Sequence, residues 1–196
     1  MRPPVVITSR VGRIGTAVLG AAALALMVWD ASRVGLLQAL VNLPFVALFV
    51  WCGWLFWGLA SIRIDDAGVQ VVNQLRIWSV PWERLTSVTG KWGVTLTTAA
   101  QADQEKGRSI RAWAAPAKGT AGKIVSADRE MPVVPEQGST PVRVSLDAFS
   151  AARLIEIEQI QRRAGATSSD AAPVRVRVNW PTVIISGVLV ILAVLA

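Results

Sequence analysis

An uncharged run from Val34 to Ile62 limits what this chain can fold into more than any other feature. Only Gln38 and Asn42 within the run are strongly polar. The run is long enough to cross a bilayer as a tilted helix. It therefore predicts a transmembrane helix over residues 36–60.

Two further uncharged runs lie toward the two ends of the sequence. Residues Ile14 to Trp29 would span about 24 Å as a helix, and the two preceding residues can lengthen it to cross the hydrocarbon core. Residues Val178 to Ala196 would span about 28 Å. Together with the mean hydropathy of +0.46, the runs predict three transmembrane helices, over about 12–29, 36–60 and 178–196.

The first run also has the basic start, apolar middle and small residues of a signal peptide, so cleavage is the alternative interpretation. Trp29 and Asp30 occupy the place where a small-residue cleavage motif is expected, and a second apolar run follows almost at once. These features favour a retained helix. The link formed by residues 30–33 is so short that the first two helices should form an antiparallel hairpin.

The arginines before the first run set the expected orientation. Arg2, Arg10 and Arg13 precede the apolar segment, and basic residues favour the cytoplasmic side of a membrane. Two crossings then return Arg63 and the following domain to the cytoplasm. The last helix would leave the C-terminus outside, so the sequence predicts a multi-pass protein of the cell membrane.

Between the hairpin and the last run, the hydrophobic period changes from helical to alternating. Residues Ser61 to Val72 form two predicted strands around the turn Asp65–Gly68. A third strand covers Arg76 to Val80 and ends at Pro81, which has no N–H for the ladder. Further strands are predicted over 85–92, 94–99, 109–115 and 141–146. This part of the chain therefore predicts an antiparallel sheet domain in an α+β protein.

One helix should close the domain. Asp147 stands at its start, Arg162 and Arg163 lie in its last turn, and Gly165 stops it. The predicted apolar face comprises Phe149, Leu154, Ile157 and Ile160. The predicted organisation is a helical hairpin at 1–60, a domain at 61–164 with an exposed insertion at 116–141, a linker at 165–177 and a final helix at 178–196.

The composition argues against catalysis. The sequence contains no histidine and a single cysteine, Cys52, which lies inside an apolar run. A histidine base, a Cys-His dyad and the usual zinc sites are therefore excluded, and the carboxylates show no motif spacing. We expect a protein that is not an enzyme and has no cofactor and no metal. The net charge of +7 is better explained by orientation signals than by nucleic-acid binding.

The tryptophans fall into two groups. Trp51, Trp54 and Trp57 recur every three residues near the end of the second run, which is typical of an anchoring belt at the membrane interface. Three more tryptophans are predicted to pack in the core or at the edge of the domain. These are Trp78, Trp82 and Trp113.

Several motifs resemble those of bacterial pleckstrin-homology-like membrane proteins, and most closely the actinobacterial family known as low-molecular-weight protein antigen 6. The motifs are Asp66-Ala67-Gly68-Val69, then Val80-Pro81-Trp82 followed by Leu85 and Val88, then Arg111-Ala112-Trp113, and the helix from Leu146 to Arg163. The resemblance covers residues 61–164 and, in arrangement, the helices before them.

This resemblance implies a seven-stranded, bent antiparallel sandwich that a C-terminal helix closes. Pleckstrin-homology domains that bind phosphoinositides use basic residues around the first hairpin, whereas Asp65 and Asp66 form that turn here. Two carboxylates would repel an inositol phosphate, so the departure argues against this ligand. The fold alone does not supply the function.

Three functions are compatible with these features. The first is a membrane-tethered interaction module that binds a protein partner at the cytoplasmic face. The second is an accessory subunit of a larger membrane complex, held by helix packing at Gly20, Asn42 and Gly187. The third is a sensor of anionic lipid surfaces, with basic side chains worth about 1 kcal/mol each. Its predicted contacts are Arg63, Arg76, Arg84 and Lys91.

Overall fold

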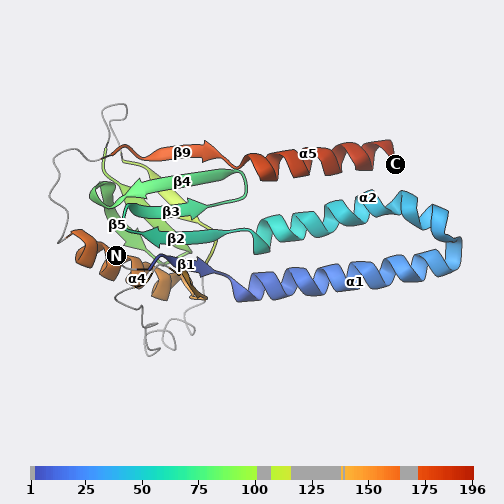
Figure 1. The fold of residues 1–196 in the computed structure, drawn as a ribbon, viewed down its shortest axis with the longest axis horizontal. Helices are drawn as coiled ribbons and strands as arrows, with labels where there is room; N and C mark the ends of the chain where they lie inside the picture. The colour runs from blue at the N-terminus through green and yellow to red at the C-terminus, as the bar shows by residue number, and fades with distance from the viewer. Residues whose placement is uncertain (1–2, 101–106, 116–137, 139, 164–171) are drawn as a thin grey trace. The chain divides into compact units, whose positions relative to one another are not determined.

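The computed structural model divides the chain into two units (Figure 1). It describes residues 3–100, 107–115, 138, 140–163 and 172–196. The sheet unit comprises residues 1–9 and 60–177, and the helical unit comprises residues 10–59 and 178–196. Most of the predicted insertion, at 116–137 and 139, and most of the predicted linker, at 165–171, lie outside the described residues, as does residue 164 at the end of the predicted domain.

The helical unit contains three apolar helices. Helix α1 covers Arg10–Val34, α2 covers Leu36–Gly53 and continues as the π-helical turn η1, Trp54–Gly58, and α5 covers Trp180–Leu195. Gly35, whose φ is 92°, separates α1 from α2. Helix α2 lies between α1 and α5 and contacts both (Figure 1).

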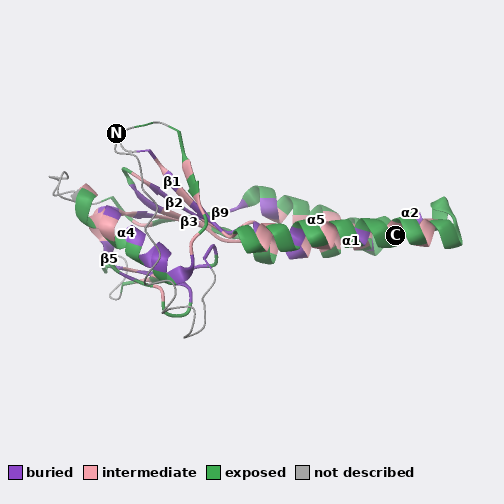
Figure 2. Ribbon diagram, turned by 90° about the horizontal axis from the view of Figure 1, so that it is seen from below, coloured by how far each residue is buried: buried purple, intermediate pink, exposed green. Residues whose placement is uncertain are grey.

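Two of these helices are long and apolar enough to cross a membrane. They are α1, with 25 residues, and the continuous helix Leu36–Gly58, with 23. Helix α5 is apolar but has only 16 residues, or about 24 Å. Exposed and half-buried residues run along all three helices, whereas buried residues concentrate in the strands and in α4 (Figure 2). Such surfaces suit a lipid environment.

Polar side chains connect the three helices at separate points. Asn42 Nδ2 on α2 donates a hydrogen bond of 3.0 Å to Asp30 Oδ2 on α1. Trp51 Nε1 on α2 donates one of 2.9 Å to Ser186 Oγ on α5. Gly187 has no neighbouring atom within 4 Å of an added Cβ, so it makes no close contact within the helical unit. The contact to α2 comes from the serine beside it.

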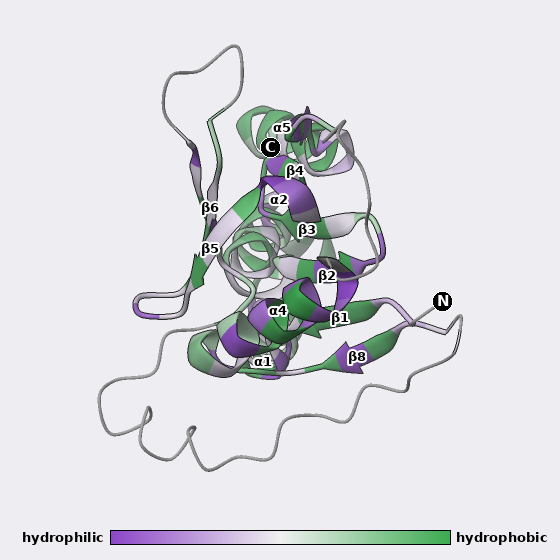
Figure 3. Ribbon diagram, turned by 90° about the vertical axis from the view of Figure 1, so that its left-hand side faces the viewer, coloured by the Kyte–Doolittle hydropathy of each residue, from purple (hydrophilic) through white to green (hydrophobic). Residues whose placement is uncertain are grey.

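The sheet unit contains a mixed six-stranded sheet in the order β8-β1-β2-β3-β4-β9. Strands β8, β1, β2, β3 and β4 follow one another in this order in the view of Figure 3. Strand β1 pairs antiparallel with β2 and parallel with β8. The strand bounds are β1 Val5–Thr8, β2 Ser61–Asp65, β3 Gly68–Val72, β4 Arg76–Pro81, β8 Val142–Val144 and β9 Arg175–Val178.

A three-stranded antiparallel sheet and one helix complete this unit. The sheet comprises β5 Leu85–Thr89, β6 Val94–Thr98 and β7 Ser109–Ala112, and it follows the short 3-10 turn η2, Trp82–Arg84. Helix α4, Ala148–Arg163, packs on β5, β6 and η2. The described residues thus form nine strands with one parallel pair, where the sequence resemblance implied seven antiparallel strands.

The predicted face of α4 is only partly right: Leu154 is buried and Ile157 is half-buried. Phe149 and Ile160 are exposed, and Ile155, which the prediction left out, is completely buried. The buried residues of α4 are Ala148, Ser150, Ala151, Ala152, Leu154, Ile155 and Glu158. Small residues dominate because the helix lies close to the sheet: a Cβ on Gly90 would approach the Ala148 carbonyl oxygen to 2.4 Å. Asp147 does cap the helix, accepting a 2.9 Å hydrogen bond from the Ser150 N–H.

Three predicted boundaries also need correction. Residues 30–33, predicted as the link between the first two helices, belong to the last turns of α1, and the chain reverses at Gly35 instead. Residues Val5–Thr8, assigned to the helical hairpin, form a sheet strand with Val5 and Ile7 completely buried. Residues 175–177, assigned to the linker, belong to β9 at the sheet edge. Both strands are short and stand beside a much longer apolar run, so their alternation was hidden in the sequence.

Candidate functional site

The strand register distinguishes two ends of the six-stranded sheet. At one end a row of paired residues crosses β1 to β4, comprising Thr8, Ser61, Val72 and Ile77. At the other end Asp65 pairs with Gly68, which pairs with Pro81. We call the first the helix-joined end, because the chain passes there from β1 to α1 through one residue and from η1 to β2 through two. We call the second the free end.

The four basic residues predicted as lipid contacts do not form one cluster. Arg63 lies within β2, with its Nε 3.7 Å from Asp65 Oδ2. Arg76 begins β4 beside the helix-joined end, whereas Arg84 lies in η2, beyond the other end of the same strand. Lys91 lies in the turn between β5 and β6 and is exposed. The fold therefore does not place all four residues on a single surface.

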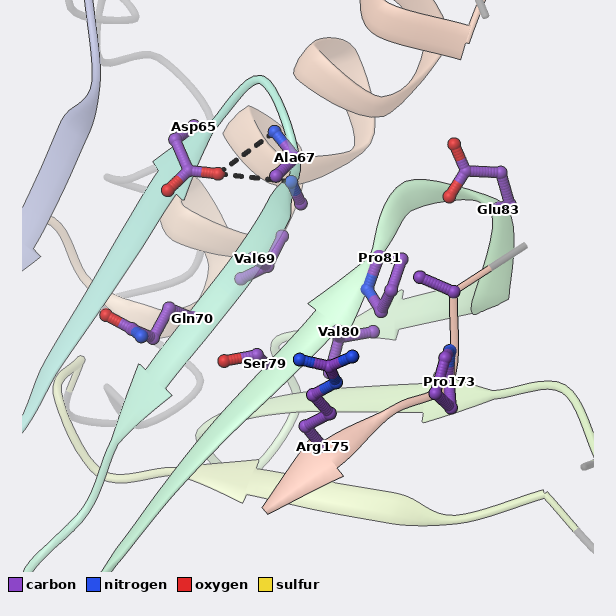
Figure 4. Close-up of a pocket in the computed structure, with 12 residues that line it drawn as sticks. Asp65, Ala67, Val69, Gln70, Ser79, Val80, Pro81, Glu83, Pro173 and Arg175 are labelled. Atoms are coloured by element: carbon purple, nitrogen blue, oxygen red, sulfur yellow. Dashed lines mark hydrogen bonds between the residues drawn. The ribbon is translucent and has the colours of Figure 1, made fainter. Parts of the chain in front are cut away.

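A pocket of about 450 Å³ opens at the free end of the sheet. Its walls are the β2–β3 turn, the second half of β4, and the segment that leads into β9 (Figure 4). The residues that line it are Asp65, Ala67, Gly68, Val69, Gln70, Ser79, Val80, Pro81, Glu83, Ala172, Pro173 and Arg175. This pocket is our candidate functional site.

The β2–β3 turn is built by Asp65. Its Oδ1 accepts hydrogen bonds from the backbone N–H groups of Ala67, at 3.1 Å, and Gly68, at 3.2 Å (Figure 4). Its carbonyl oxygen accepts a 3.0 Å hydrogen bond from Trp82 Nε1. Asx turns of this kind fix the local backbone. Asp65 therefore shapes one wall of the pocket and anchors a tryptophan of the core.

Asp66, the second carboxylate of the turn, connects it to the closing helix. It pairs with Arg162, whose Nε also lies 2.7 Å from Glu158 Oε2. Arg162 and Glu158 are both buried, with side-chain exposures of 6% and 3%. The two acidic residues that argue against a phosphoinositide thus have structural contacts within the sheet unit.

The remaining polar lining residues offer hydrogen bonds along the two central strands. Gln70 on β3 stands directly opposite Ser79 on β4. The guanidinium of Arg175 extends across β4 toward Ser79, and Glu83 lies beyond Pro81 (Figure 4). An amide, a hydroxyl and a guanidinium in one pocket are suited to binding backbone groups and a carboxylate. In the described part of the chain, no group of three His, Cys, Asp or Glu residues could hold a metal ion.

The sequence analysis did not select these lining residues. Gln70 and Ser79 occupy the outward positions of alternating strands, so a search for polar side chains on neighbouring strands could have paired them. Arg175 gave no such signal, because its role depends on β9, which the sequence analysis placed in a linker. The predicted core tryptophan Trp82 is only 2% exposed, whereas Trp113 is 58% exposed.

No family model matches the chain, and no curated protein or solved structure matches it either. The resemblance to pleckstrin-homology-like membrane proteins therefore stays a prediction from the sequence motifs.

Proposed function

We propose that the protein is a non-enzymatic, membrane-tethered interaction module whose pleckstrin-homology-like domain binds a protein partner at the cytoplasmic face. The observation that carries this proposal is the difference between the two ends of the six-stranded sheet. One end joins apolar helices through one or two residues, and the opposite end holds an open pocket with unlike polar groups. A domain arranged in this way presents a binding site while the chain remains anchored.

Three transmembrane crossings form part of the proposal. Two helices have the required length, and α5 could serve as a third crossing if the bilayer thins locally or flanking residues contribute. Tryptophans near the helix ends support interfacial anchoring: Trp29 is near the end of α1, Trp57 in η1 and Trp180 at the start of α5. All three are exposed.

The strand pairing supports the proposed orientation. Strand β1 precedes α1 and β2 follows η1, yet the two strands are hydrogen-bonded neighbours. If α1 and α2 both cross a bilayer, this pairing requires both ends of the hairpin to be on one side. The arginines that begin α1, Arg10 and Arg13, favour the cytoplasmic side.

The pocket chemistry indicates the kind of partner. An extended polypeptide segment could supply backbone groups to Gln70 and Ser79 and a carboxylate to Arg175. The pocket lies at the border between β4 and the edge strand β9. Strand β9 is the last strand of the sheet, and an edge strand suits recognition of an extended chain.

One observation favours the accessory-subunit alternative. The helical unit has an apolar groove of about 560 Å³, formed by α1 and α2 with one residue from η1, Trp54, and one from α5, Leu189. Small residues in the groove would allow another helix to approach closely. These are Gly20, Ala23 and Ala47. In this alternative the helices would hold the partner.

Site-specific photocrosslinking of the full chain in native membranes separates these functions. A photoreactive residue at Ser79 should yield one defined adduct, and Arg175→Glu should remove it. The matched control is a photoreactive residue at the exposed Glu156 on α4, which should give no such adduct. Identical adducts at Ser79 and Glu156 would contradict pocket recognition. Adducts formed only from Ala47 in the groove would support the accessory-subunit function instead.

A further inference from the structure

Three large apolar side chains are exposed on turns of the sheet unit. Leu75 is 55% exposed in the β3–β4 turn, Trp92 is 74% exposed in the β5–β6 turn, and Trp113 is 58% exposed just after β7. Exposed apolar residues that occur singly need no explanation, but a cluster that includes two tryptophans marks an interaction surface.

Hydrogen bonds bring these three turns together. Asn73 Nδ2 donates to the Arg111 carbonyl oxygen at 2.8 Å, and Asn73 Oδ1 accepts from the Trp113 N–H at 3.3 Å. The Arg111 guanidinium lies 5.5 Å from the centre of the Trp113 ring and donates to the Trp92 carbonyl oxygen. One asparagine and one arginine thus hold the aromatic residues at the surface.

The same turns carry positive charge. Arg76, Lys91 and Arg111 are exposed, and no acidic residue occurs in the segments 73–76, 89–94 or 109–115 that form the turns. We call the set Leu75, Arg76, Lys91, Trp92, Arg111 and Trp113 the tryptophan surface. It includes two of the four basic residues that the sequence analysis selected.

The register places the tryptophan surface at the helix-joined end of the sheet. Asn73 directly follows Val72, which stands in the row with Ser61 and Thr8. The chain leaves this row for α1, and enters it from η1, through no more than two residues. The helix ends connected to it carry interfacial residues of their own, Trp57 in η1 and Arg10 in α1.

We propose that the tryptophan surface docks on the headgroup region of the anionic bilayer in which the chain is anchored. Tryptophan favours the membrane interface, and arginine and lysine favour anionic headgroups. The inference rests on the membrane tether of the proposed function and is independent of its pocket. Docking would orient the domain, with the free end of the sheet directed away from the lipid.

Lipid quenching in nanodiscs tests the docking on the full chain. Cys52→Ala removes the native thiol, and Thr89→Cys places a fluorescent label on an exposed residue beside Lys91. The matched control is Ala67→Cys, exposed in the β2–β3 turn at the free end. We expect lipids with headgroup nitroxides to quench the label at residue 89 and to leave the label at residue 67 unquenched.

Lipid composition and substitutions separate docking from tethering alone. In bilayers with equal parts of phosphatidylcholine and phosphatidylglycerol, Arg76→Glu should lower the docking equilibrium constant by about fivefold or more. Arg153→Glu, the same change at an exposed position of α4, should leave this constant unchanged. Trp92→Ser combined with Trp113→Ser should reduce quenching in neutral bilayers as well. Equal quenching at residues 67 and 89, or quenching at residue 89 that none of these variants alters, would overturn the proposal.

Discussion

Arg162 Nε and Glu158 Oε2 pair at 2.7 Å within one helix, and both side chains are almost completely buried. The pair also connects α4 to the β2–β3 turn, because the same guanidinium contacts Asp66. Two charged groups thus lie where the face of α4 meets the rest of the sheet unit. Because both side chains are buried, each charge needs the other as its ion-pair partner.

Removing one partner should therefore be costly. Arg162→Met leaves the Glu158 carboxylate buried without its guanidinium, and we expect the free energy of unfolding to fall by about 3–5 kcal/mol. Pulse proteolysis of the full chain in detergent, over a denaturant series, measures this change. Glu156→Gln on the exposed side of α4 should have little effect. The double variant Arg162→Met with Glu158→Met should be more stable than Arg162→Met alone, and the opposite order would contradict this interpretation.

Gly68 should not tolerate even alanine. An added Cβ would lie 2.1 Å from the Val80 carbonyl oxygen and 2.8 Å from the Pro81 Cα, so β4 would have to move. We expect Gly68→Ala to lower the free energy of unfolding by about 2 kcal/mol or more and to weaken the photocrosslink at Ser79. Ala67→Ser, at the exposed neighbouring position, is the control. A Gly68→Ala protein with unchanged stability and crosslinking would contradict the register described here.

Trp51 and Ser186 allow a measurement of how α5 is held to α2. Their hydrogen bond should appear in a double-mutant cycle of Trp51→Phe and Ser186→Ala as a coupling energy of about 0.6 kcal/mol. Thermal unfolding of the detergent-solubilised chain gives the four stabilities. Trp57→Phe replaces Trp51→Phe in a control cycle, because Trp57 is exposed and should show no coupling to Ser186. Equal coupling in both cycles would exclude a direct Trp51–Ser186 contribution.

Two tryptophans of the sheet unit should differ strongly in their contribution to stability. Trp82 is 2% exposed and donates to the Asp65 carbonyl oxygen, so Trp82→Ala should cost about 3–5 kcal/mol. Trp92 is 74% exposed, and Trp92→Ala should change the free energy of unfolding by no more than about 0.5 kcal/mol. The denaturant series described above compares them. A large loss in Trp92→Ala would show that this residue stabilises the fold rather than a surface interaction.

The central strands and the apolar helices could be predicted because each has a clear period. Ile62 and Ile64 alternate with polar neighbours and are completely buried, and the strands on both sides of Asp65–Gly68 pair as the turn residues predict. Helix α1 contains the first apolar run and extends beyond both of its ends, and the second run contains the α2–η1 helix. Local patterns decide these elements, so sequence reasoning could find them.

The face of α4 and the edge strands depend on tertiary contacts instead. Ala151 and Ala152 carry little hydrophobic signal, yet the closeness of α4 to the sheet makes small side chains the ones that fit. The pocket needed β9 next to β4, and the tryptophan surface needed Asn73 to join separate turns. No local pattern in the sequence encodes these pairings.

The position of β1 before α1 also has a consequence for biogenesis. During synthesis β1 leaves the ribosome first, but its antiparallel partner β2 follows only after the whole of α1 and α2. If these helices insert as a hairpin, β1 stays without its partner β2 until insertion is complete. A hairpin inserted the wrong way would leave β1 and β2 on opposite sides and the sheet unfinished. The complete sheet would therefore form only after correct insertion. An incomplete sheet would be accessible to proteases that degrade misassembled membrane proteins.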